Sequence, residues 1–219
     1  MVEGQLHRGA PGRGFTLIEL LIAIGVIAVV LALAFPVLRS VSSSSDAARC
    51  AANLRNLAAA AAMFANDANG VLPNQMFNRQ EGGICKYLDL PINYIGKTVM
   101  TCPSLHREYP PAKGVYHYRT TSINLVATFD YKKGVKYRSK VAAPSTMMLF
   151  IDGMWNETAS TQGQNNFHFG ALNDSEQFHK LIYPHSERCQ VVFLDGHVEL
   201  VTREQLEDTA TKDNLWYGR

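Results

Sequence analysis

The chain has 219 residues, about one and a half times the commonest domain size, so one globular domain with an appendage fits better than two full domains. With 47% hydrophobic and 18% charged residues, the composition excludes a disordered chain, a collagen-like repeat and a coiled-coil rod. Twenty-one basic and nineteen acidic side chains leave a net charge of +2, which lacks the basic footprint of a nucleic-acid-binding protein. We therefore expect no nucleic acid partner.

An apolar run near the N-terminus extends from Phe15 to Leu38 and contains a single charged residue, Glu19. As a helix rising about 1.5 Å per residue, this run is long enough to cross a bilayer core of about 30 Å. Arg8 and Arg13 precede the run, and the positive-inside rule keeps such a basic end in the cytoplasm. Everything after Leu38 would then be exported.

Three interpretations of this run predict different mature N-termini: a permanent anchor, a cleaved signal peptide and a prepilin leader followed by its helix. Ala32, Leu33 and Ala34 form an A-x-A pattern that suits signal peptidase. Glu19 counts against a signal peptide, because a carboxylate near the bilayer centre costs about 2.5 to 3.5 kcal/mol and needs a purpose.

The residues from Arg13 to Leu21 read RGFTLIELL and resemble the prepilin cleavage and methylation motif of type IV pilins and type II secretion pseudopilins. The resemblance implies that prepilin peptidase cuts after Gly14 and that Phe15 becomes the N-methylated terminus. It further implies that Glu19, five residues into the mature chain, pairs in a filament with the ammonium of a neighbouring subunit's Phe15. Pro36 falls where pilin helices often carry a proline that loosens the helix locally.

The helix is expected to continue beyond the apolar run to about Asn66. The segment after the serine run is rich in strong helix formers, and the alternative is a flexible joint at the serines. One apolar stripe recurs at helical spacing and predicts a buried face: Ala47, Cys50, Leu54, Leu57, Ala61 and Phe64. Asn69-Gly70 is a helix C-cap signal, and Pro73 prevents resumption of the helix.

The remaining chain, residues 69–219, is expected to form a globular head. Candidate strands rich in β-branched, aromatic and long apolar residues are Val115–Ala127, Thr146–Ile151, Gln190–Leu194 and His197–Val201. These strands predict an antiparallel sheet, and residues 152–174 are expected to be a long loop. Thr202 and Gln205 predict a capping box for a short C-terminal helix. The expected fold class is therefore α+β and pilin-like, with a leader at 1–14, an assembly helix at 15–38 and its amphipathic continuation at 39–68.

A second motif lies near the C-terminus, where His185 is followed by nine residues and then by Asp195-Gly196. This pattern resembles the H-x(9)-DG domain associated with prepilin-type processing in bacterial pilin-like proteins. Asp-Gly between two apolar runs is also a strong hairpin signal, and a type I′ turn needs positive φ at both central residues. We therefore interpret the Asp-Gly pair as a signature of the fold rather than as a catalytic pair.

The sequence gives little support for a metal or an enzyme. His179, His185, Cys189 and His197 lie close together, but their spacing is not that of a recognised zinc site. Calcium is a second possibility, because major pseudopilins bind it through carboxylates and carbonyls; Asp152, Glu157 and Asp174 could serve, but no EF-hand-like spacing supports them, and we expect no cofactor. The chain has no G-x-S-x-G, and Gly96-Lys97-Thr98 lacks the earlier glycine of a P-loop. We expect no enzymatic activity.

Four cysteines, at 50, 85, 102 and 189, are too few for a disulfide scaffold and lack C-x-x-C spacing. In an oxidising compartment, thiols that can meet are expected to be bonded. Cys85 with Cys102 is the favoured pairing because it closes a short loop, worth about 3 kcal/mol in the chain-entropy estimate. Cys50 with Cys102 is the alternative, and Cys189 is expected to remain a small buried thiol.

Together these features predict a prepilin-like structural subunit with a single-pass helix in the inner membrane and its head in the periplasm or outside the cell. Its expected partners are prepilin peptidase and other pilin-like subunits, which pack through the N-terminal helix in a type IV pilus or a type II secretion-like pseudopilus. The alternative is a membrane-tethered periplasmic binding or hydrolytic module that uses a pilin-type leader for export.

Overall fold

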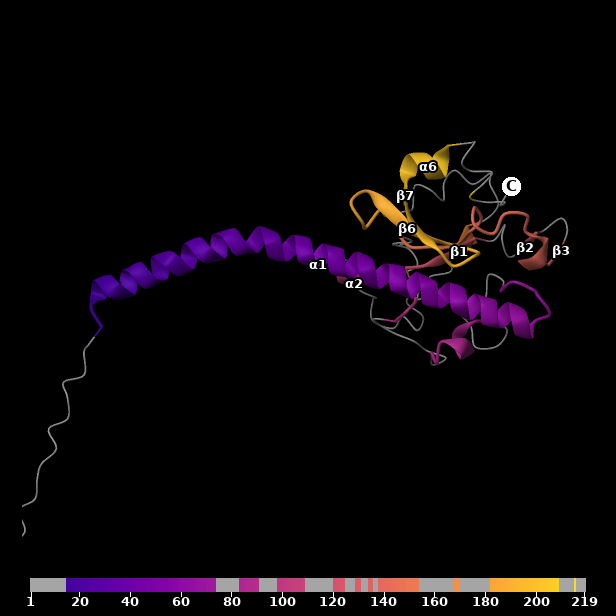
Figure 1. Cartoon of the computed structure of the whole chain (residues 1–219), viewed down its shortest axis with the longest axis horizontal. Coiled ribbons are helices and arrows are strands. Elements are labelled where there is room, and N and C mark those ends of the chain that lie inside the picture. The colour runs from indigo at the N-terminus through magenta and orange to yellow at the C-terminus, as the bar shows by residue number, and fades with distance from the viewer. Residues whose placement is uncertain are drawn as a thin grey trace, which may run out of the picture. The chain divides into compact units, whose positions relative to one another are not determined.

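The structure is a computed structural model. It describes residues 15–73, 83–90, 98–108, 120–124, 129–130, 134–135, 138–153, 168–169, 182–208 and 215. The chain divides into two compact units, Met1–Ser42 and Ser43–Arg219. A single helix, α1 (Leu17–Asp67), contributes its N-terminal part to the first unit and its C-terminal part to the second (Figure 1).

The N-terminal part of α1 is apolar on all sides. Residues Leu17–Phe35 have a mean hydropathy of 2.9, and none of this segment is buried. Its large side chains are more than half exposed, from Leu31 at 53% to Leu17 at 84%. The segment is therefore long and apolar enough to cross a membrane, and it fits a membrane anchor.

The C-terminal part of α1 is amphipathic. The helix runs through the serine run without a break, so the expected continuation is confirmed and a flexible joint is not formed. Cys50, Leu54, Leu57 and Ala61 of the predicted stripe are buried, whereas Arg55 on the opposite face is exposed. The period of 3.6 residues per turn thus places the apolar side chains on one face of the helix.

α1 ends where the sequence predicts. Asn69 and Gly70 both have positive φ, at 54° and 87°, which is the left-handed conformation that terminates a helix. The Gly70 N–H donates to the Ala65 carbonyl oxygen at 2.6 Å and caps the last turn.

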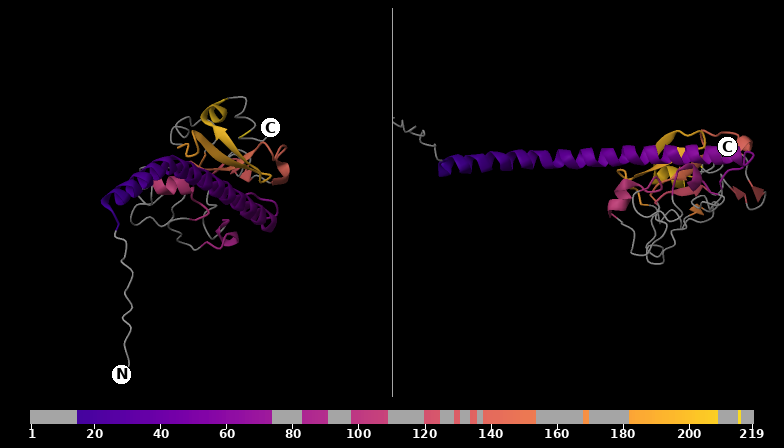
Figure 2. Two further views of the ribbon diagram at one scale, coloured as in Figure 1. Left: turned by 60° about the vertical axis from the view of Figure 1, so that its left-hand side comes forward. Right: turned by 90° about the horizontal axis from the view of Figure 1, so that it is seen from below.

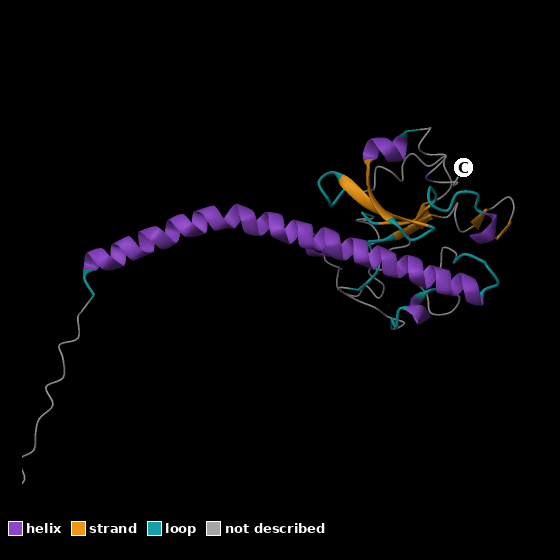
Figure 3. Cartoon of the chain, in the orientation of Figure 1, coloured by secondary structure: helices purple, strands orange, loops and turns teal. Residues whose placement is uncertain are grey.

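The main sheet has five strands in the order β5-β1-β4-β6-β7. Strands are drawn in orange in Figure 3. Their bounds are Ser122–Asn124 for β1, Met148–Ile151 for β4, His168–Phe169 for β5, Arg188–Phe193 for β6 and Val198–Thr202 for β7. Four strands, β1, β4, β6 and β7, pair in antiparallel fashion, as predicted. The edge strand β5 pairs in parallel with β1 and lies in a stretch that we expected to be entirely loop.

Short elements complete the described part of the head. They are the 3₁₀ helices η1 (Cys85–Tyr87) and η2 (Arg138–Lys140), the helices α2 (Pro103–Glu108) and α6 (Arg203–Glu207), and the small strands β2 (Phe129–Asp130) and β3 (Gly134–Val135). α6 begins with the predicted capping box, in which the Thr202 hydroxyl accepts from the Gln205 backbone N–H and the Gln205 side chain accepts from the Thr202 N–H. The architecture is therefore α+β and pilin-like, which confirms the predicted fold class.

The hydrophobic core lies between the C-terminal part of α1 and the sheet (Figure 2). Leu54 and Leu57 of α1 belong to one cluster with Ile123 of β1, Phe150 of β4 and Val192 of β6, all completely buried. The two parts of α1 therefore differ in burial: the sheet covers one face of the C-terminal part, whereas the apolar N-terminal part is exposed.

A hairpin turn forms at Asp195-Gly196, but the prediction that it is of type I′ is wrong. Gly196 has a φ of 97°, but Asp195 does not have positive φ. The Gly196 N–H donates to the Phe193 carbonyl, and the Phe193 N–H donates to His197, so the hairpin has a three-residue loop with glycine at the left-handed position. Positive φ at two successive residues occurs instead at Ser186 and Glu187, in the turn that leads into β6.

Replacing Leu57 by Ala tests the packing of α1 on the sheet. Leu57 is completely buried, so Leu57→Ala should lower the free energy of unfolding of the head by about 2 to 5 kcal/mol through lost transfer energy and a cavity. Met63→Ala is the matched control on the same helix, because Met63 is 52% exposed and its loss should cost less than about 0.5 kcal/mol. Urea denaturation of the full-length protein in detergent, followed by near-UV circular dichroism, measures both; equal effects would contradict this packing.

Candidate functional site

The predicted processing segment lies at the start of α1. Gly14 falls outside the described residues, and Phe15 is 85% exposed. A carboxylate oxygen of Glu19 accepts from the Thr16 backbone N–H at 2.9 Å and from the Thr16 hydroxyl at 2.8 Å. The Thr16 hydroxyl in turn accepts from the Glu19 N–H at 3.3 Å.

These reciprocal bonds form a capping box that was not predicted from the sequence. The pattern Thr-x-x-Glu before an apolar run is the signal that would have found it. Glu19 also lies in the first turn of α1, where a negative charge is stabilised by the helix dipole. The only charged side chain of the segment Leu17–Phe35 is thus satisfied within its own chain before any assembly.

The second predicted motif does not form one site. His185 lies in the turn before β6, and Asp195-Gly196 lies in the loop after it, so a whole strand of about 20 Å separates them. Asp195 accepts from the backbone N–H and Nδ1 of His197, at 3.1 and 2.6 Å. Although partial burial opposes ionisation, these bonds lower the pKa of Asp195. Asp195 and His185 therefore belong to two separate sets of contacts.

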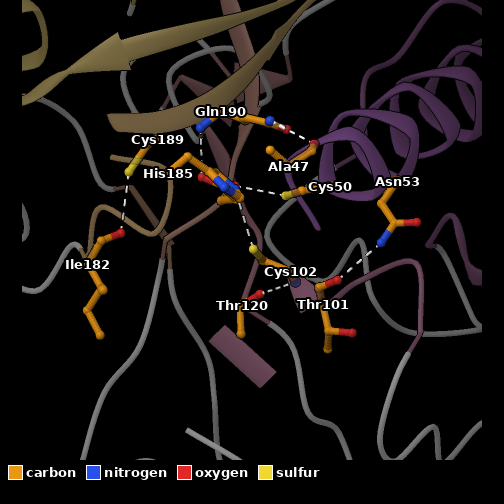
Figure 4. A network of polar contacts seen from close by, with 11 residues as sticks. Ala47, Cys50, Asn53, Thr101, Cys102, Thr120, Ile182, His185, Cys189 and Gln190 are labelled. Atoms are coloured by element: carbon orange, nitrogen blue, oxygen red, sulfur yellow. Dashed lines mark hydrogen bonds and ion pairs between the residues drawn. The ribbon is translucent and has the colours of Figure 1, made fainter. Parts of the chain in front are cut away.

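His185 belongs to a buried polar cluster, which we define as Cys50, Cys102, Asp152 and His185 (Figure 4). Four segments supply it: α1, the residue before α2, the residue after β4 and the turn before β6. The candidate ligand atoms of the four side chains all lie within 4.8 Å of one another. Each residue is at most 5% exposed, so the cluster is closed to solvent.

The contacts within the cluster converge on two atoms. Asp152 Oδ2 accepts from Cys50 Sγ at 2.8 Å and lies 2.9 Å from His185 Nε2. The same Nε2 lies 3.5 Å from Cys102 Sγ. His185 Nδ1 has no hydrogen-bond partner among the described residues.

The surroundings shift the pKa values of the two thiols in opposite directions. The neighbouring Cys50 side chain and the contact with His185 lower the pKa of Cys102, even though burial opposes this. The bond to Cys102, burial and the nearby Asp152 raise the pKa of Cys50 well above its usual value. Burial lowers the pKa of His185, but its contacts with Asp152 and Cys102 outweigh burial and raise it. The surroundings therefore favour the thiolate form at Cys102 and disfavour it at Cys50.

Neighbouring groups hold the cluster in place. The Gln190 N–H donates to Asp152 Oδ1 at 2.8 Å, and the Gln190 side-chain amide donates to the Ala47 carbonyl of α1 at 2.9 Å. The Cys102 N–H donates to the Thr120 hydroxyl at 2.6 Å. These bonds fix the backbone and the second carboxylate oxygen, and they leave Oδ2, Nε2 and both sulfurs directed at one another.

This geometry does not suit nucleophilic catalysis. A Cys-His-Asp relay needs the nucleophile on one ring nitrogen and the carboxylate on the other. Here Cys102 and Asp152 both contact Nε2 of His185. The four candidate ligand atoms instead converge on one small region, as the ligands of a metal ion do.

The structure contains no bond between the predicted disulfide partners Cys85 and Cys102. The four cysteines all lie within the described residues, and none of them is in a disulfide there. Cys85 packs in the main core below α1, whereas Cys102 packs with Cys50 and Leu105 in a separate cluster. The two predicted partners therefore lie in different parts of the head, and the structure instead brings Cys102 beside Cys50, its alternative partner.

The other residues considered as metal ligands are dispersed or lie outside the described residues. Cys189 Sγ donates to the Ile182 carbonyl at 3.5 Å, and His197 pairs with Asp195. His179, Glu157 and Asp174 fall outside the described residues. Asp152, considered for calcium, lies instead between a thiol and an imidazole.

Comparison with known proteins gives one family match. Residues 12–35 match the model of the prokaryotic N-terminal methylation motif. No curated protein and no solved structure matches the chain. The matched segment covers the apolar half of α1 and supports a prepilin-like, type IV pilin-like protein. The motif implies processing by a peptidase, and its family is structural rather than enzymatic.

A glycine next to the cluster provides a test of how tightly this region is built. Gly153 has a φ of 88°, and a Cβ there would collide with the Ile182 carbonyl oxygen and Cys189 Sγ. Gly153→Ala should therefore cost more stability than the roughly 1 to 3 kcal/mol of backbone strain alone. Gly196→Ala is the matched control, because its φ of 97° carries the same strain but a Cβ there meets nothing within 4 Å. Thermal denaturation of both variants measures the difference; an equal loss would contradict the close approach of Ile182 and Cys189.

Proposed function

We propose that this chain is a structural subunit that prepilin peptidase cuts after Gly14 and N-methylates at Phe15. α1 then anchors the subunit in the inner membrane and packs against other pilin-like subunits in a type IV pilus or a type II secretion-like pseudopilus. The observation that carries this proposal is an N-terminal half-helix that combines the methylation motif with apolar side chains exposed on every side.

Exposed apolar side chains on all faces of a helix need lipid or other helices to cover them. Leu20, Leu21 and Leu33 are each more than half exposed in the single chain, and at about 100° per residue they point to three different sides of the helix. A bilayer covers them before assembly, and neighbouring helices cover them in a bundle. A plain anchor would need only the bilayer to cover these side chains, and it would use Glu19 only as a helix cap.

Glu19 favours assembly over simple anchoring. A carboxylate buried among apolar helices is costly unless it is paired. Cleavage after Gly14 would create an ammonium at Phe15, four residues from Glu19. In a helical bundle, the ammonium of one subunit can pair with Glu19 of the next and take over from the Thr16 bonds of the single chain.

The head is proposed to lie in the periplasm or outside the cell, because Arg8 and Arg13 hold the short N-terminal end in the cytoplasm. The H-x(9)-DG pattern is proposed to mark the same class of processed proteins. Its role here is in the fold: His185 and Asp195 anchor the turns at the two ends of β6. No cofactor takes part in this function.

The N-terminus of the mature protein tests processing directly. We expect the intact mass and N-terminal sequence to show a chain that begins at Phe15 and carries one extra methyl group. Gly14→Trp should abolish the cut, because the peptidase site accepts only a small residue before Phe15. A start at Phe35 would instead support a signal peptide, and a start at Met1 a permanent anchor; normal maturation of the Gly14 variant would also contradict the proposal.

Glu19→Gln separates charge from helix capping. The amide keeps an oxygen that can accept from Thr16, but it cannot pair with an ammonium. We expect export to be unchanged and crosslinked oligomers in membranes to be strongly reduced, because the neighbour's ammonium loses its partner.

Thr16→Ala is the matched control for Glu19→Gln. It removes the hydroxyl partner of the capping box and leaves the carboxylate in place. We expect the Thr16→Ala variant to form crosslinked oligomers in membranes as the wild type does. Equal loss of oligomers in the two variants would mean that Glu19 acts only as a helix cap.

A further inference from the structure

We propose that the buried polar cluster binds one zinc ion in a closed, four-coordinate structural site that fastens α1 to the sheet. The side chains offer two sulfurs, one imidazole nitrogen and one carboxylate oxygen from four separate segments. This site is independent of how the N-terminus is processed.

The spacing of the atoms suits a tetrahedral ion. Zinc binds sulfur at about 2.3 Å and nitrogen or oxygen at about 2.0 Å, which places the ligand atoms about 3.3 to 3.8 Å apart. The observed contacts are 2.8, 2.9 and 3.5 Å, and all pairs lie within 4.8 Å. Ligation therefore needs side-chain shifts of about 1 Å or less and no rearrangement of the backbone.

The donor set selects the class of metal. Thiolate and imidazole suit zinc, whereas calcium takes six to eight oxygen ligands. Asp152 Oδ2 is the only oxygen among the converging atoms, since Oδ1 accepts the Gln190 N–H. A fixed carboxylate of this kind, with its second oxygen hydrogen-bonded to the backbone, is typical of an oriented ligand.

The charge balance also favours a cation. When a metal displaces the two thiol protons, Cys50, Cys102 and Asp152 offer three anionic ligand atoms, and each of these residues is at most 2% exposed. Among the described residues, the only ion-pair partner of Asp152 is His185. Burial of unpaired charge is costly, and a divalent ion bound to both thiolates and the carboxylate offsets most of it. Binding would release the thiol protons and leave the imidazole neutral.

Metal content of the full-length protein tests the proposal. The protein is purified from membranes in detergent, equilibrated with zinc and dialysed against metal-free buffer. We expect about one zinc per chain by mass spectrometry, as in a closed structural site. Cys102→Ser and Asp152→Asn should lose the bound zinc. Cys85→Ser should retain it, because Cys85 is equally buried but lies in the main core.

Alkylation of the wild-type protein tests the same site without relying on variants that could fail to fold. With zinc bound, Cys50 and Cys102 should resist alkylation, and a chelator alone, without reductant, should make both reactive. The rival state is a Cys50–Cys102 disulfide, which would need a reductant and would appear as a linked peptide without metal. A linked peptide would overturn the proposal, as would wild-type protein that holds no zinc and whose two thiols react without a chelator.

Discussion

The structure depends on one helix that must satisfy two surroundings along its length. The N-terminal part of α1 exposes apolar side chains on every side, and the C-terminal part presents only one apolar stripe to the sheet. The backbone hydrogen bonds of the helix are the same in both parts, so side-chain pattern alone decides what each part packs against. The change of pattern falls near the serine run, where the chain also divides into its two compact units.

After the serine run in the sequence, the head is organised around the contacts that α1 makes with the sheet. Leu54 and Leu57 pack in the core with residues of β1, β4 and β6, and burial of such apolar side chains is the main favourable contribution to folding. The buried polar cluster lies outside this core. There Cys50 donates to Asp152, and the same carboxylate oxygen contacts His185. Apolar side chains thus fill the space between helix and sheet, and polar contacts join Cys50 and Ala47 of α1 to Asp152 and Gln190.

Local signals predicted much of this fold. The helix expected from Phe15 to Asn66 is observed from Leu17 to Asp67, because capping residues and periodicity act within a few positions. The hairpin β6–β7 was predictable for the same reason, although its turn type was not, since Gly196 has positive φ and Asp195 does not. The polar cluster was not predictable. Cys50, Cys102 and Asp152 meet only through tertiary folding, and no spacing in the sequence relates them.

The position of the first head contacts on α1 has a mechanical consequence. Asp46, which binds Arg107, is the first buried residue among the side chains of α1 that the structure describes, and the Ala47 carbonyl and Cys50 follow within little more than one turn. A force drawn along the helix axis would enter the head through these contacts before it reached the leucines. The load would be carried as shear across several polar bonds at once, rather than by peeling side chains from the core one after another.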